Sequence, residues 1–174
     1  LLLMYPVTVP FMEALGRVFG EFVRSDFYVS PFDNSAMDGF AVRAADIASA
    51  TTDAPVELDV IEDIPAGAAP RLTVGSGQAA RIMTGATMPE GADTVVKIES
   101  TSAKETGGMV GEKVGILGPE NEGANVRYKG EEVAAGDVVV ARGDGVNAAT
   151  VGLFAATGNV EVSVYRRPRV AIIA

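Results

Sequence analysis

Hydrophobic residues recur at helical spacing between residues 11 and 24. Residues three and four positions apart lie on one face of an α-helix, so this spacing predicts an amphipathic helix. Pro10 suits its entry, because the amide hydrogen that proline lacks would have no partner there. Gly16 and Gly20 weaken a helix and are explained by close packing. The apolar positions are Phe11, Met12, Leu15, Val18, Phe19, Phe22 and Val23.

After Ser30 the pattern changes to short apolar runs separated by glycine, proline and aspartate. Such runs are typical of β structure with many turns. Short strands bury a face only by packing together, so we interpret residues 26–144 as one compact β-rich module. The predicted strands are Gly39–Val42, Val56–Ile61, Gln78–Ile82, Thr94–Glu99, Val114–Leu117 and Val138–Ala141.

A second helix is predicted after the β-rich module. Asn147 is a suitable N-cap, Gly158 suits the left-handed residue that ends many helices, and the residues between them up to Ala156 are mostly apolar. Alternation of hydrophobic and polar residues then predicts a half-buried strand. Its apolar positions are Val160, Val162 and Val164.

The order of these elements predicts the domain organisation. Helical segments flank the β-rich module, so the simplest arrangement is a small domain of residues 1–25 and 145–167 with residues 26–144 inserted into it. We expect its two helices to pack on each other. The predicted fold class is α+β, mainly β.

The last residues form a continuous β-branched and apolar run, Arg169 to Ala174. Such a run is typical of a parallel strand covered on both faces by helices. We therefore interpret residues 168–174 as the first strand of a further α/β domain. An edge strand of the present domain is the alternative.

Composition narrows the possible chemistry. The sequence has no cysteine and no histidine, which excludes thiolate chemistry, catalytic triads with histidine and histidine zinc sites built from this chain alone. Carboxylates, hydroxyls, Lys, Arg and backbone amides remain, and these groups suit Mg²⁺ and oxyanions. Net charge is −9, from 23 acidic and 14 basic residues, which disfavours nucleic acid as a partner. No run of about 18 apolar residues predicts a membrane span, so we expect a cytoplasmic protein.

The run from Pro31 to Asp46 contains the first candidate site. Residues 33–35 are an aspartate, an asparagine and a serine that can cap their own backbone amides, and Asp38-Gly39 is a tight-turn pair that precedes a strand. Alternatively, Asp38 presents a carboxylate beside Asn34 and Ser35 to a Mg²⁺ ion or a phosphate ligand.

Residues 81–93, RIMTGATMPEGAD, form the second candidate site. Two glycines alone predict no nucleotide site, and the Gly-Lys-Ser/Thr ending of a P-loop is missing. Thr84 and Gly85 would expose a hydroxyl and an amide to an anion, and a plain hairpin turn is the alternative.

The third segment, residues 123–132, places two cations and two carboxylates close together. Arg127 can bind an oxyanion with two hydrogen bonds, while Glu131 or Glu132 holds a cation or orients the arginine. The alternative is a solvated hairpin whose charges pair weakly.

Taken in order, these segments resemble the MoeA/gephyrin family of molybdopterin molybdenumtransferases. FDNSAMDGFAVR, RIMTGATMPEGADTVV and NVRYKGEE resemble three N-terminal signatures of that family, and PRVAII resembles the strand that leads into its catalytic domain. The resemblance covers nearly the whole chain.

The resemblance implies an enzyme that inserts molybdate into adenylylated molybdopterin with Mg²⁺ and releases AMP. It implies a homodimer that receives its substrate from a molybdopterin-adenylylating enzyme. By motif, Asp38, Thr84 and Arg127 are the implied catalytic residues, with Asp38 the possible metal ligand. Asn34, Ser35, Gly85, Lys129 and Glu132 are the implied substrate-binding residues.

Parts of the family pattern are missing from this sequence. The acidic motif after the Ile-Ile-Ala strand and the pterin-binding third domain are absent, so we expect residues 1–174 alone to be inactive. A non-catalytic dimerisation or scaffold module of the gephyrin type is the second hypothesis. A β module without a ligand is the third.

Overall fold

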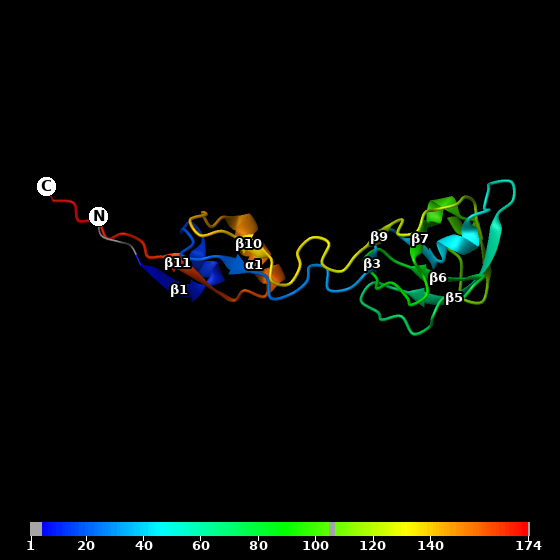
Figure 1. Ribbon diagram of the computed structural model, residues 1–174, viewed down its shortest axis with the longest axis horizontal. Helices are drawn as coiled ribbons and strands as arrows, with labels where there is room; N and C mark the ends of the chain where they lie inside the picture. The colour runs from blue at the N-terminus through cyan, green and yellow to red at the C-terminus, as the bar shows by residue number, and fades with distance from the viewer. Residues whose placement is uncertain (1–4, 105–106, 174) are drawn as a thin grey trace. The chain divides into compact units, whose positions relative to one another are not determined.

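A computed structural model describes residues 5–104 and 107–173, which divide into two compact units. Unit 1 comprises residues 1–31 and 130–174, and unit 2 comprises residues 32–129 (Figure 1). The inserted unit is shorter than the predicted 26–144. Residues on either side of it pair with each other, as in the bridge between Val29 and Val133, and therefore belong to unit 1.

Unit 2 is built around a five-stranded sheet in the order β7-β4-β6-β5-β8. Strands β5 and β6 are parallel, and the other neighbours are antiparallel. The strands are β4 (Gly39–Val42), β5 (Val56–Ile64), β6 (Gln78–Ile82), β7 (Thr94–Lys97) and β8 (Lys113–Ile116). All five strands were predicted. The bounds of β4 and β6 are as predicted, and those of the other three differ at their ends.

Short elements complete unit 2. Strands β3 (Asn34–Ser35) and β9 (Val126–Arg127) form a separate antiparallel pair. The described part of unit 2 also has 3₁₀ turns: η2 (Ala44–Ile47) follows β4, and η3 (Ile98–Ser100) and η4 (Ser102–Lys104) follow β7 in succession.

Both faces of the sheet are covered by hydrophobic residues. Phe40, Leu58 and Val60 belong to one buried cluster, and Ile64 and Ile82 belong to another. Burial on both faces explains why β4 has four buried residues in succession.

A bulge in β5 changes the face to which its side chains point. The pairing with β6 shifts between Val60 and Glu62, so Ile61 has no partner residue on β6. An extra residue in a strand reverses the alternation of faces beyond it. Val60 therefore packs in one cluster and Ile64 in the other, although both are even-numbered.

Unit 1 has two small antiparallel sheets and one α-helix. The elements are β1 (Pro6–Pro10), η1 (Phe11–Ala14), β2 (Val23–Arg24), β10 (Val138–Val140), α1 (Ala148–Thr157) and β11 (Glu161–Tyr165). Strand β1 pairs with β11, and β2 pairs with β10. The predicted cap of α1 is confirmed, because the Asn147 side chain accepts a hydrogen bond from the Thr150 amide and Gly158 is left-handed, with φ 77°.

The predicted helix from residue 11 to 24 is wrong. Only the turn η1 forms, because the chain is extended at Leu15 and left-handed at Gly16, with φ 74°. Beyond that point Val18 and Phe19 form strand bridges instead. The expected packing of two helices is replaced by an edge contact between Phe19 and Phe154, whose ring centroids lie 5.3 Å apart.

The apolar run after Pro168 forms no strand over the residues described. Val170, Ile172 and Ile173 are 79%, 92% and 93% exposed, and Ala174 lies outside the described residues. A strand requires a neighbouring strand as its hydrogen-bond partner. None of the helices in the described ranges is long and apolar enough to cross a membrane.

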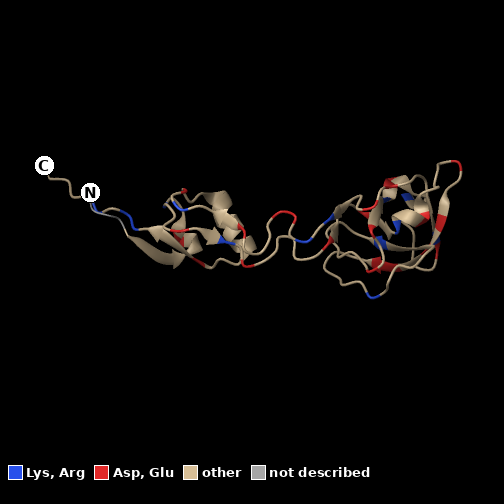
Figure 2. Ribbon diagram, in the orientation of Figure 1, with Lys and Arg blue, Asp and Glu red and all other residues tan. Residues whose placement is uncertain are grey.

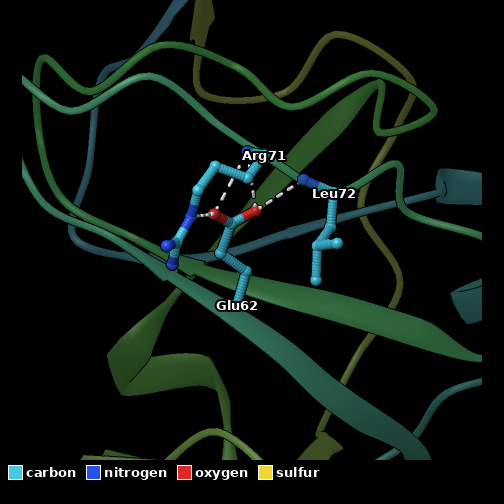
Figure 3. A network of polar contacts seen from close by, with 3 residues as sticks. All are labelled: Glu62, Arg71 and Leu72. Atoms are coloured by element: carbon cyan, nitrogen blue, oxygen red, sulfur yellow. Dashed lines mark hydrogen bonds and ion pairs between the residues drawn. The ribbon is translucent and has the colours of Figure 1, made fainter.

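Glu62 anchors the loop between β5 and β6 (Figure 3). Its side chain is only 4% exposed and accepts hydrogen bonds from the amides of Arg71 and Leu72 and from Arg71 Nε at 3.0 to 3.2 Å. Burial alone would raise the pKa of Glu62, but these hydrogen bonds and the Arg71 charge outweigh it and lower the pKa. The loop is therefore held by an ionised carboxylate.

Replacing Glu62 tests this anchor. Glu62→Gln should lower the free energy of unfolding by about 1–3 kcal/mol at neutral pH, because a charged acceptor is lost. Since the folded state lowers the pKa of Glu62, its stabilising effect is present above the unfolded-state pKa and is lost as pH falls through the folded-state pKa. In urea unfolding, the difference in unfolding free energy between the wild type and Glu62→Gln should therefore become smaller as the pH is lowered. Exposed Glu57→Gln is the control, and an equal effect of both changes would contradict the anchor.

Gly39 lies so close to β7 that a side chain has no room. A Cβ atom at this position would be 2.0 Å from the Val96 carbonyl oxygen. Gly39→Ala should cost about 1–3 kcal/mol of folding stability because the strands must separate. Gly118→Ala, where nothing lies within 4 Å, is the control for thermal unfolding. Equal thermal unfolding midpoints for the two variants would contradict this prediction, because the sheet would then accommodate the added methyl group without loss of stability.

Candidate active site

Asp38 and Thr84 meet where β4 begins and β6 ends. Gly39 pairs with Ile82 in the antiparallel ladder, so the residues just outside the two strands face each other. Asp38 Oδ1 accepts hydrogen bonds from both the amide and the hydroxyl of Thr84, each at 2.7 Å. Asp38 Oδ2 accepts none that we observe within the described chain. The structure therefore joins two motif residues that are far apart in the sequence.

The pKa of Asp38 is lowered by this contact. The Thr84 amide contributes most and its hydroxyl next, while slight burial opposes them and the Arg81 charge adds a smaller lowering effect. Asp38 is exposed. At neutral pH it is therefore an ionised carboxylate that can bind a cation or a hydrogen-bond donor.

Asn34 and Ser35 support the site from within. They are 5% and 0% exposed. The Ser35 hydroxyl donates to the Met37 carbonyl at 2.6 Å and accepts from the Met37 amide at 3.2 Å. The Asn34 side chain donates to the Phe32 carbonyl at 3.2 Å. These side chains shape the turn before Asp38, which agrees with the structural interpretation of the motif.

Gly85 also has a structural partner. Its amide donates to the Ser35 carbonyl at 2.8 Å, and the Ser35 amide donates to the Ala86 carbonyl at 3.0 Å. The Gly85 amide is therefore not the free anion donor that the sequence suggested. In this turn, Thr84 contributes the groups that contact Asp38.

Arg127 and Lys129 lie on and after β9. Arg127 pairs with Asn34 across the β3–β9 ladder, and both basic side chains are exposed. The Lys129 amide donates to Asp33 Oδ1 at 2.7 Å. The structure thus joins segments of all three motifs through β3. It gives no direct contact between Arg127 and Asp38.

Glu132 belongs to unit 1, where its amide donates to the Val29 carbonyl at 3.2 Å. The cluster of motif residues described above is confined to unit 2.

The site offers one carboxylate to a metal ion. In the described part of the chain no three Asp or Glu residues are arranged to hold one. Mg²⁺ commonly binds one or two carboxylates and completes its shell with substrate phosphates and water. The free oxygen of Asp38 fits one such ligand position.

Sequence reasoning missed Asn125, which supports the site. It has a left-handed backbone, with φ 57°, and its side chain donates to the Val95 carbonyl at 2.8 Å. Asp33 was expected to cap a backbone amide close to it in sequence, but it accepts a hydrogen bond from the distant Lys129 amide. An asparagine directly before a short strand is a signal for such a turn. The charged residue Arg81 was also not singled out.

Acidic and basic residues are interspersed along the backbone of unit 2 (Figure 2). Arg81 forms an ion pair with Asp63, and Lys113 forms one with Asp59. Arg127 pairs with Asn34 across the β3–β9 ladder and Lys129 follows two residues later, so both basic residues lie on or beside a strand of the joined motifs.

Comparison with known proteins finds relatives that share one name, molybdopterin molybdenumtransferase. The chain is 46% identical over 168 residues to "Molybdopterin molybdenumtransferase 2" of Mycobacterium tuberculosis (strain ATCC 25618 / H37Rv), covering 97% of this chain and 40% of the relative. It is 41% identical over 162 residues to the molybdopterin molybdenumtransferase of Bacillus subtilis (strain 168), covering 93% and 37%. The chain thus spans about 40% of these relatives' length.

A solved structure and a family model agree. The molybdopterin biosynthesis MoeA protein from Pyrococcus horikoshii OT3 superposes with a TM-score of 0.85 at 36% identity, covering 94% of this chain and 41% of that one. The family model of the MoeA N-terminal region (domain I and II) matches residues 2–158. Because this match covers most of its residues, the chain belongs to the MoeA N-terminal region family.

Proposed function

We propose that this chain is the N-terminal part of a molybdopterin molybdenumtransferase, which inserts molybdate into adenylylated molybdopterin and releases AMP. The observation that carries the proposal is the exposed Asp38 carboxylate, fixed by two 2.7 Å hydrogen bonds from Thr84. Relatives named molybdopterin molybdenumtransferase support it. The chain matches about 40% of the length of these relatives, so the proposal concerns the whole protein and assigns only part of its site to these residues.

In the proposed mechanism Thr84 restrains Asp38 by holding Oδ1. Asp38 Oδ2 then remains available at a defined position, and the lowered pKa keeps it ionised. Mg²⁺ held by Asp38 would neutralise charge on the substrate phosphate. Asn34, Ser35 and Gly85 maintain the turns that carry these groups.

Arg127 has the anion-binding role in this proposal. Its guanidinium is exposed on β9 and can donate two parallel hydrogen bonds to a phosphate or molybdate. Lys129 adds positive charge two residues away.

The proposal also includes a cytoplasmic homodimer supplied by a molybdopterin-adenylylating enzyme. Unit 1 carries large exposed hydrophobic side chains that are accessible to a second subunit. They include Tyr5, Met12, Leu15, Phe22, Phe27 and Val160.

A chimera tests the reaction. This chain is joined to the C-terminal remainder of the Mycobacterium tuberculosis relative, and AMP release and molybdenum bound to molybdopterin are measured. Asp38→Ala should lower kcat/KM on the order of 100-fold, because a fixed charge at the reacting phosphate is lost. Asp38→Asn should be similarly impaired, and exposed Asp53→Asn should retain activity. Full activity of Asp38→Ala would remove Asp38 from the mechanism.

Arg127 is tested in the same chimera. Arg127→Ala should raise KM about tenfold for the anionic substrate, since a charge-assisted contact is lost. Arg127→Lys should recover only part of this loss, because lysine cannot bind with two parallel hydrogen bonds. Steady-state kinetics over a range of substrate concentrations give the result. Lys104→Ala is the exposed-cation control, and an equal KM increase there would point to general surface charge.

A further inference from the structure

The aromatic residues of unit 2 differ sharply in burial. Its sequence contains three, Phe32, Phe40 and Tyr128. Phe40 is 0% exposed in the core, whereas Phe32 is 41% exposed and Tyr128 is 52% exposed. Aromatic rings stabilise a fold mainly through the large apolar area that they bury. The two exposed rings therefore contribute little to the core of unit 2.

The two exposed rings lie at the same end of the β3–β9 pair. The strands are antiparallel, and Phe32 comes just before β3 while Tyr128 comes directly after β9. The Lys129 amide donates to Asp33 Oδ1 at 2.7 Å, which keeps the two segments together beyond the ladder. Single exposed apolar residues are common on protein surfaces, but here the fold brings two aromatic ones together from distant parts of the sequence. We call Phe32 and Tyr128 the aromatic patch.

The ring of Tyr128 is held against the backbone at one end. A Cβ atom added to Gly123 would lie 2.7 Å from Tyr128 Oη, so the hydroxyl end of the ring rests on this glycine. A side chain that is already restricted loses little conformational entropy when a ligand packs on it. Tyr128 is therefore both exposed and oriented, as a residue that binds a flat ligand should be.

Cationic residues stand on both sides of Tyr128 in the sequence. Arg127 and Lys129 are both exposed. An arginine can bind a phosphate with two parallel hydrogen bonds, and aromatic side chains stack on planar heterocycles such as nucleobases. Aromatic rings beside cations therefore suit a ligand that joins a planar ring to a phosphate.

The aromatic patch and Asp38 lie at opposite ends of one set of paired segments. Segment 84–88 pairs with β3 on the side away from β9, and the Met88 amide donates to the Asp33 carbonyl at 2.9 Å. Thr84, which binds Asp38, begins this segment, and Met88 ends it near the aromatic patch. An extended chain rises about 3.3 Å per residue, so these ends are at most about 13 Å apart. One nucleotide-sized ligand can therefore reach both ends.

We propose that Phe32 and Tyr128 form a ring-binding subsite: they stack on a planar heterocycle of the substrate while Arg127 binds the phosphate next to it. Adenylylated molybdopterin carries two such rings, the adenine and the pterin. The subsite adds an apolar contact to a site whose other groups are charged or polar. This inference rests on the proposed function for its ligand, while the binding of a ring is measurable without the reaction.

NMR titrations of this chain test the subsite directly. AMP and 6-carboxypterin are the ring probes, and ribose 5-phosphate is the probe without a ring. Tyr128→Ala and Phe32→Ala should each weaken binding of a ring probe about tenfold, because stacking is lost, and leave ribose 5-phosphate unchanged. Tyr128→Phe should bind like the wild type. Met109→Ala, which removes an exposed apolar side chain elsewhere on unit 2, is the control.

The comparison of probes also identifies the ring. The ring probe that binds more tightly, and depends on Tyr128, shows whether adenine or pterin occupies the subsite. Arg127→Ala should weaken AMP and ribose 5-phosphate alike, because both carry the phosphate. The proposal is overturned if neither ring probe shifts the resonances around Tyr128 at millimolar concentration, or if Tyr128→Ala leaves the affinities of both ring probes unchanged.

Kinetics of the chimera test the use of the subsite in the reaction. Tyr128→Ala should raise KM for adenylylated molybdopterin about tenfold with kcat nearly unchanged, and Tyr128→Phe should restore the KM. An unchanged KM in an active chimera would overturn the role of the aromatic patch in substrate binding. An inactive chimera with the patch intact counts against the proposed reaction, and the titrations of this chain then still decide whether the subsite binds a ring.

Discussion

The close approach of β4 to β7 is the constraint on which the rest of unit 2 depends. Gly39 lies against the Val96 carbonyl, and this contact allows β4 to pair on both sides, with β6 and with β7. The β4–β6 register then brings Asp38, just before one strand, to Thr84, just after the other. The carboxylate of the candidate site is therefore positioned by the centre of the sheet and needs no long loop to carry it. A side chain at residue 39 would disturb the fold and the site together.

Much of this arrangement was predictable because its signals are local. Asn147 and Gly158 mark a helix whose ends they cap, and the continuous apolar residues of β4 are buried on both faces. The wrong helix at residues 11–24 shows the limit of such signals. Its apolar spacing fits a helical face, yet Phe19 is buried while Leu15 and Phe22 are exposed. Pairing with β11 and the left-handed Gly16 decided the structure there, and neither is visible in the periodicity.

The sequence allowed several residues of the candidate site to be predicted, but it did not predict the contacts between them. Asp38 and Thr84 were singled out separately, and only the strand register shows that one binds the other. Ser35 and Gly85 were expected to face a ligand, but hydrogen bonds with Met37 and with each other occupy the groups in question. Polar residues in turns serve the backbone as readily as they serve ligands. A sequence alone does not separate these uses, because the partner of each hydroxyl or amide is set by distant strands.

The bulge at Ile61 determines which face of the sheet each later residue of β5 occupies. Glu62 and Asp63 are adjacent acids with opposite tasks: one is enclosed and ties down a loop, and the other is open and pairs with Arg81. Both tasks depend on the extra residue that sets the phase of the strand. Deleting that residue would exchange the two carboxylates between the faces, although every acid would still be present. Spacing therefore encodes part of this protein's chemistry, and homologous strands of equal composition but different length would not be equivalent.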